Sequence, residues 1–130
     1  AENGLPRNQA FLNFSNSDDN GNRQSIRKIL SGRKRPDGVF AAVERLIINT
    51  YEVCKELNIR IPQHLRVVCF SNLSVSALFN PPLTAIVQPA YEMGGEAADI
   101  LFKIIEKKML LPQEKQVELP SSIIVRGSSE

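Results

Sequence analysis

Tryptophan is absent from this 130-residue sequence, histidine occurs once and cysteine occurs twice. One histidine and two separated cysteines cannot form a four-ligand zinc site without carboxylates, so we expect no metal site. The 16 basic and 14 acidic side chains leave a formal charge of +2, too little to predict nucleic acid as a direct partner. No apolar run approaches the roughly 20 residues of a membrane span. We therefore expect a soluble globular domain with no membrane partner.

Motifs for catalysis and cofactor binding are also scarce. His64 lies in a Pro-Gln-His loop with no carboxylate beside it in the sequence that could orient a catalytic base. The segment Gly32 to Gly38 lacks the Gly-Lys-Ser/Thr ending of a phosphate-binding loop. We therefore expect no enzyme activity and no cofactor. A small flavodoxin-like enzyme is a weaker alternative, which turnover of a phosphorylated substrate would support.

Both cysteines lie in apolar segments. Cys54 falls within an amphipathic helical pattern and Cys69 within a strand-like run. Thiols in such segments usually behave as small buried hydrophobes in a reducing compartment. We therefore expect two free thiols and a cytoplasmic protein.

The first half of the chain alternates strand-like and helix-like patterns. A strand-like run at residues 10–15 precedes Asn, Ser, Asp and Asp at 16–19, which are residue types that cap helix N-termini. They predict a helix that ends at Ser31-Gly32, where glycine stops it. The elements expected next are a buried parallel strand at 39–42 and an amphipathic helix at 43–58.

In the second half, residues 90–108 show the clearest helical pattern. Apolar side chains fill a broad arc of this helix, and charged side chains fill the opposite face. So wide an arc suits a helix that contacts both a sheet and a second helix, and we expect some of these neighbours outside this sequence. The other expected elements are a strand at 66–70, a short helix or turn at 73–80, a strand at 83–88, and short strands at 116–119 and 123–126.

This order of elements indicates the fold class. Alternating strands and helices predict an α/β domain with a parallel sheet, helices on both faces and right-handed crossovers. Residues 1–6 resemble the end of a helix, with Gly4 and Pro6 as a stop signal. A helix that ends there must begin upstream, so we expect the later part of a longer protein.

Candidate functional residues lie at the expected strand ends. In doubly wound sheets, ligands bind beyond the carboxyl ends of the strands, where loops and helix N-termini present unpaired polar groups. The polar residues there are Ser15, Asn16, Glu44, Ser71, Asn72 and Gln88. A simpler alternative is that the serines and asparagines only cap the helices that follow them.

Several short pieces of sequence follow one another in a specific order. They are Pro36-Asp37-Gly38-Val39-Phe40-Ala41-Ala42, Ile59-Arg60-Ile61-Pro62, Arg66-Val67-Val68-Cys69-Phe70, Pro81-Pro82-Leu83-Thr84, Gln88-Pro89, Met93-Gly94, Leu119-Pro120 and Val125-Arg126-Gly127-Ser128. In this order and spacing, nearly the whole chain resembles the LacI/GalR (lactose-repressor) family of bacterial transcription regulators.

The resemblance implies a truncated type I periplasmic-binding-protein-like effector domain. In that family two α/β subdomains flank a ligand cleft, and an upstream helix-turn-helix, absent here, reads operator DNA as a homodimer. By analogy, residues 5–83 and 117–126 belong to the C-terminal subdomain and residues 84–116 to the N-terminal one. The implied function is sensing of a small-molecule effector that controls DNA binding by the missing domain.

The resemblance also implies a set of effector-binding residues, which are Phe14, Ser15, Val43, Glu44, Ser71, Asn72 and Gln88. Many sugar-responsive members have asparagine where this chain has Val43 and aspartate where it has Ser71, whereas Gln88 is kept. A carboxylate that accepts a ligand hydroxyl forms a bond worth roughly 1.5–3 kcal/mol, and valine forms none. A small neutral sugar is therefore not expected. We expect a larger glycan product, an apolar or anionic molecule, or a partner protein.

Family analogy also places the helix at 43–58 and residues 73–83 at a homodimer interface. The candidate interface residues are Ile48, Glu52, Leu78 and Phe79. Leu78 and Phe79 fit burial by a partner and fit equally well the core of their own chain.

A solute-binding receptor of a sugar importer is the alternative function, because it shares the fold without the DNA partner. A secretion signal in the complete gene product would support the receptor, and a helix-turn-helix would exclude it.

Overall fold

The computed structural model describes residues 18–106, 109 and 116–130. The strand expected at 10–15, with the candidate residues Phe14 and Ser15, lies outside these residues. The described elements are α1 (Asp19–Leu30), β1 (Gly38–Ala41), α2 (Glu44–Glu56), β2 (Arg66–Phe70), a 3-10 helix η2 (Ser74–Leu78), β3 (Thr84–Val87), α3 (Ala90–Ile105) and β4 (Ser122–Ile124).

The four described strands form one sheet in the order β1-β2-β3-β4. β1, β2 and β3 are parallel, as expected for this fold class, and β4 pairs antiparallel with β3. Residues 116–119 form no strand, so that prediction was wrong. Alternation alone cannot make a strand without a neighbour to complete the hydrogen bonds, and Pro120 carries no N–H to donate.

The start of α1 and the end of α2 carry recognisable signals; α1, α2 and the sheet are called the body below. The Asp18 carboxylate accepts hydrogen bonds from the backbone N–H of Asn20 (3.1 Å) and Gly21 (2.9 Å), which caps α1. α2 ends where Asn58 adopts a positive φ of 54°, and the Ile59 N–H then donates to the Cys54 carbonyl at 2.8 Å. This left-handed asparagine replaces the more usual glycine after a helix. The helices expected at 16–31 and 43–58 are therefore confirmed within a few residues.

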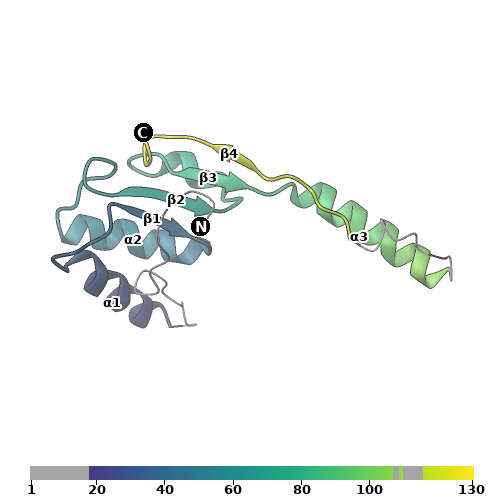
Figure 1. Cartoon of the computed structure of the whole chain (residues 1–130), viewed down its shortest axis with the longest axis horizontal. Helices are drawn as coiled ribbons and strands as arrows, with labels where there is room; N and C mark the ends of the chain where they lie inside the picture. The colour runs from purple at the N-terminus through teal and green to yellow at the C-terminus, as the bar shows by residue number, and fades with distance from the viewer. Residues whose placement is uncertain (1–17, 107–108, 110–115) are drawn as a thin grey trace.

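The described helices of the body lie on one side of the sheet. Figure 1 shows α2 beneath β1 and β2, with α1 packed beside α2. Phe40 on β1 points to the opposite face and is 59% exposed. The sequence predicted helices on both faces, and the part of the chain described here supplies them on one.

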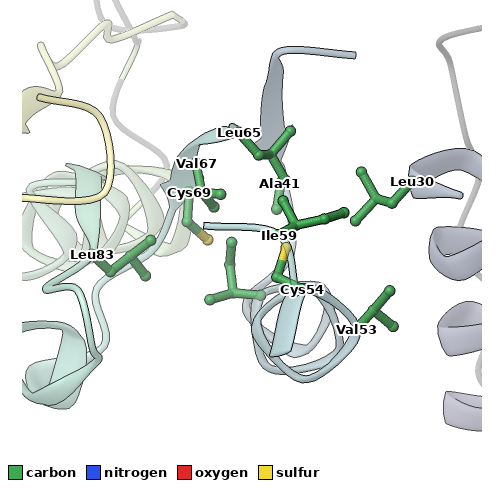
Figure 2. Close-up of a cluster of buried hydrophobic side chains, with 10 residues drawn as sticks. Leu30, Ala41, Val53, Cys54, Ile59, Leu65, Val67, Cys69 and Leu83 are labelled. Atoms are coloured by element: carbon green, nitrogen blue, oxygen red, sulfur yellow. The ribbon is translucent and has the colours of Figure 1, made fainter. Parts of the chain in front are cut away.

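The hydrophobic core lies between the sheet and α2. Val67 and Cys69 of β2 and Cys54 of α2 are buried there, whereas the buried Val53 lies on the side of α2 that faces Leu30 of α1 (Figure 2). Both cysteines are free, as expected. Burial raises the pKa of each thiol to about 11, so both remain protonated at neutral pH.

The C-terminal segment is tied to the middle of the sheet. The fully buried Ser128 hydroxyl donates to the Val67 carbonyl (2.6 Å) and accepts from the Thr84 N–H (2.8 Å). The Arg126 guanidinium donates to the Leu83 carbonyl at 2.7 Å. Through these bonds the C-terminal segment links the beginning of β3 to β2.

α3 differs from the other helices because none of its residues is buried. Figure 1 shows it extending away from the sheet and its helices. Large apolar side chains of this helix are exposed to solvent, including Leu101 (55%), Phe102 (61%) and Ile105 (64%). The broad apolar arc predicted at 90–108 is therefore present and uncovered in the described structure.

Candidate functional site

The parallel register brings five of the seven predicted site residues to one edge of the sheet. Ala41 pairs with Cys69 and Phe70 pairs with Ile86, so the three strands end side by side. The residues that follow them form a strand-end cluster, defined here as Val43, Glu44, Ser71, Asn72 and Gln88. This is the edge at which α/β sheets bind ligands.

Glu44 is the charged centre of the strand-end cluster. Its Oε1 atom accepts a hydrogen bond from the Ser71 hydroxyl (2.7 Å) and another from the Asn72 backbone N–H (3.2 Å). Oε2 makes no hydrogen bond to the described residues. Its negative charge also acts on a thiol in the core. Burial is the largest cause that raises the pKa of Cys69, and the charge of Glu44 is the second.

Ser71 is a supporting residue in this geometry. Its side chain is buried, with 5% exposure, and its hydroxyl also accepts the Leu73 N–H at 2.9 Å. Both hydrogen-bonding functions of the hydroxyl are therefore used inside the protein. Ser71 does not cap the helix that follows it, because η2 begins after Leu73 without a side-chain cap; its hydroxyl instead closes a turn at Leu73.

Asn72 and Gln88 form a reciprocal pair that joins the ends of β2 and β3. The Asn72 side chain donates from Nδ2 to the Gln88 carbonyl (2.9 Å) and accepts from the Gln88 N–H (2.8 Å). The side-chain amide of Gln88 remains without a hydrogen bond to the described residues. The pair fixes the backbone immediately before α3 and leaves that amide available.

Val43 places an apolar surface at the end of β1. It occupies the N-cap position of α2, offers no side-chain hydrogen bond there and is 44% exposed. The cluster therefore combines an apolar patch, a carboxylate and an amide.

An open depression of about 410 Å³ adjoins the cluster. Asn72 and Gln88 line one part of it, and Tyr91 and Glu92 of α3 line another. Tyr91 and Glu92 were not predicted as site residues, although both lie within four residues of Gln88. The signal in the sequence that could have identified them is an aromatic residue and an acidic residue just after the end of a strand.

A larger cavity of about 620 Å³ lies elsewhere, between α1, β1 and α2. Its lining is mainly apolar, with Ile26, Leu30, Leu46 and Phe40 among its residues. It runs beside the edge of β1 that pairs with none of the described strands. Arg35, Asp37 and Thr50 also line it. The strand-end cluster is the better candidate because it lies at the carboxyl ends of the parallel strands, where α/β sheets bind ligands.

The residues considered for catalysis and metal binding do not gather at this edge. His64 Nδ1 accepts a hydrogen bond from the Arg60 N–H at 3.2 Å, in the loop that precedes β2. Among the described residues, no group of three or more His, Cys, Asp or Glu side chains could hold a metal ion. The helices of this same part of the chain are too short or too polar to span a bilayer.

The four predicted interface residues fall into two groups. Ile48 (50%) and Leu78 (81%) are exposed, and Glu52 forms an ion pair with Arg23 at 3.2 Å on the surface. Phe79 instead packs against the core, with its ring centroid 4.9 Å from that of Tyr51.

The fold agrees with comparisons to known proteins. The chain matches the periplasmic binding protein-like domain over residues 1–129 and therefore belongs to that family. It superposes on the structure of the transcriptional regulator CelR in complex with cellobiose with a TM-score of 0.80 and 22% identity. That match covers 98% of this chain and 38% of CelR, and it supports the fold.

Within this class the relatives are regulators of the lactose-repressor type. The chain is 31% identical to the lactose operon repressor of Rhizobium radiobacter over 107 residues, which cover 82% of this chain and 92% of that protein. It is 29% identical to the ribose operon repressor of Escherichia coli K12 over 110 residues, which cover 85% of this chain and 33% of the repressor. The chain is a member of the LacI family and spans about a third of the ribose repressor's length.

Proposed function

We propose that this chain is the effector-sensing and dimerisation part of a bacterial transcription regulator whose DNA-binding helix-turn-helix precedes residue 1. Relatives named as lactose and ribose operon repressors support a regulator over a solute receptor of an importer. They are also regulators rather than enzymes, in keeping with a purely binding role. A cytoplasmic location follows from this proposal, because operator DNA lies there.

The proposed domain division follows from the surroundings of α3. Residues 5–83 and 117–126 were expected to form one subdomain and residues 84–116 the second. The boundary moves to the end of β3, because Thr84–Val87 pair with β2 and β4 in the sheet of the first subdomain, so residues 88–116 belong to the second. The absence of any buried residue in α3 supports this division, because its apolar side chains need a neighbour that the described residues do not supply.

The reciprocal pair between Asn72 and Gln88 carries the proposal. It lies where the chain leaves β3 and enters α3, which is the junction between the two proposed subdomains. A ligand that contacts the Gln88 side chain therefore binds beside the hinge. A ligand with different affinities for the open and closed forms shifts the equilibrium between them, and the dimer transmits this shift to the DNA-binding domains.

The proposed effector is a small carbohydrate-derived molecule. The relatives are named for lactose and ribose operons, and the CelR structure contains cellobiose. Val43 makes the floor of this chain's cluster partly apolar, which favours a glycan fragment that presents a sugar face over a compact monosaccharide held only by hydroxyl groups.

The proposed homodimer interface uses the exposed surface of α2 and η2. Ile48 and Leu78 supply its apolar contacts, and Glu52 lies at its charged margin. Phe79 supports this surface from within, through its contact with Tyr51.

Operator binding by the complete gene product tests the proposal. DNA fragments from the gene's own neighbourhood are tested in a mobility-shift assay against a panel of mono- and oligosaccharides. At least one saccharide is expected to change operator affinity, and at 100 times its Kd it should stabilise the fold by about 2.7 kcal/mol in a thermal-shift assay.

A matched pair of variants locates the response. Gln88→Ala is expected to lose the saccharide response while keeping operator affinity. Gln63→Ala, an exposed glutamine in the loop before β2, should respond like the wild type. A complete gene product that binds no DNA, or whose DNA binding ignores every saccharide, would refute the proposal.

A further inference from the structure

The strand-end cluster and the adjoining depression carry acidic side chains without basic partners. Glu44 stands in the cluster and Glu92 lines the depression. No lysine, arginine or histidine occurs among the described residues that line either one. The next residue after Glu44 is Arg45, and its Nε pairs with Asp19 of α1 at 3.2 Å. This half of the site therefore presents net negative charge to a ligand.

The position of the Glu44 carboxylate is fixed by its neighbours. The Ser71 hydroxyl and the Asn72 N–H both hold Oε1, and α2 begins at this residue. A carboxylate held at one oxygen can offer the other to a ligand without losing side-chain freedom on binding, and preorganised groups of this kind contribute most to selectivity. Valine at 43 and the internally bonded Ser71 leave Glu44 as the only charged group of the cluster.

We infer that Glu44 selects the effector by charge, binding hydroxyl or ammonium groups and excluding anions such as sugar acids and sugar phosphates. The inference rests on the proposed function and narrows its effector class. Of the effectors expected from sequence, the anionic molecule is thereby disfavoured, because a carboxylate and an anion repel each other in a partly buried cleft.

A purely structural role for Glu44 makes a different prediction. An acid in the first turn of α2 interacts favourably with the helix dipole, and its bonds to Ser71 and Asn72 brace the loop after β2. Removing its charge would then lower stability without changing the order in which ligands of different charge bind.

The experiment compares three β-1,4-linked disaccharides that share one ring frame and differ in charge. Binding of the glucosamine disaccharide, cellobiose and cellobiouronate to the complete regulator is measured by titration calorimetry at about pH 6, where the amine carries a proton. The glucosamine disaccharide is expected to bind at least about tenfold more tightly than cellobiouronate, with cellobiose between them. Glu44→Gln keeps an oxygen for Ser71 and Asn72 but removes the charge, and should reduce this ratio to about threefold or less.

Glu96→Gln is the control, because it removes the same charge from an exposed position on α3. It should leave the ratio unchanged. Cellobiouronate binding as tightly as the glucosamine disaccharide, an unchanged ratio in Glu44→Gln, or no binding of any of the three disaccharides overturns the inference. If another saccharide still releases the operator in that last case, the proposed function stands and only the role of Glu44 falls.

Discussion

Two buried serines, Ser71 and Ser128, fix the backbone around them. Each hydroxyl donates to one group and accepts from another inside the protein, Ser71 between Glu44 and the Leu73 N–H, and Ser128 between two strands. Buried polar groups must find such partners, because leaving one unsatisfied costs more than a hydrogen bond gains. At both positions serine therefore holds neighbouring groups in place. In the strand-end cluster, Ser71 would influence a ligand only by positioning Glu44.

Ser128→Ala is expected to lower the free energy of unfolding by about 1–3 kcal/mol, because it leaves the buried Thr84 N–H without its acceptor. Urea unfolding of the chain measures the change. Ser31→Ala, which removes an exposed hydroxyl 3.4 Å from the Lys28 carbonyl, is the control and should stay within about 0.5 kcal/mol of the wild type. Equal unfolding curves for the two variants would show that the Ser128 bonds contribute nothing.

At the residue scale, the sequence predicted which side chains gather but not what each one bonds. The ends of β2 and β3 are readable because each is followed by a polar residue, Ser71 and Gln88, and parallel register then brings those residues together. Whether Ser71 faces a ligand or Glu44 depends on a contact between residues 27 positions apart, which no local pattern encodes. Its commitment to Glu44 became visible only in the structure.

At the element scale, the helices were predicted closely because both their faces and their ends carry local signals. The Asp18 cap and the Asn58 turn mark ends of α1 and α2 independently of the apolar stripes. The strands were harder. Residues 116–119 alternate like a strand yet have none beside them, and no local pattern shows that β4 pairs antiparallel with β3. Pairing is a property of two segments, so one segment alone predicts it poorly.

The ion pairs between α1 and α2 make a pH-dependent contribution to stability. Arg23 and Arg27 both contact the Glu56 carboxylate, and the hydrogen bond from Arg23 is the main cause that lowers the pKa of Glu56 below its usual value. The folded state therefore binds the Glu56 proton more weakly than the unfolded state. This stabilisation is present above the unfolded pKa of about 4.5 and is lost as pH falls through the lower folded pKa.

Glu56→Gln is accordingly expected to lower the urea midpoint at about pH 7, and the difference from wild type should shrink toward zero at about pH 3. The effect at neutral pH is small because these side chains are solvent-exposed. Glu96→Gln removes an equal charge from α3 and should match the wild type at both pH values. A midpoint difference that persists in acid would assign the effect of Glu56 to packing instead of charge.

At the scale of the whole molecule, the body and α3 differ in how much of their apolar surface is buried. The body buries Ile47, Val53 and Val67 completely, whereas α3 buries no residue. The sequence pattern predicted this difference, because so wide an apolar arc suits a helix that contacts both a sheet and a second helix, and some of these neighbours were expected outside this sequence. It could not identify the neighbour. An apolar helix face indicates that a neighbour covers it, but the structure of that neighbour depends on other residues.

Phe102→Ala tests whether that partner lies outside the described chain. Phe102 is 61% exposed here, so the substitution should change the unfolding free energy of the 130-residue chain by less than about 0.5 kcal/mol. In the complete regulator, where the proposed second subdomain covers α3, the same substitution should cost about 3–5 kcal/mol. Glu96→Ala, on the charged face, should cost little in either protein. Urea unfolding of both proteins gives the comparison. An equal large loss in the short chain would place the cover of α3 within these 130 residues, and an equal small loss in both would leave the helix uncovered and refute the proposed division into subdomains.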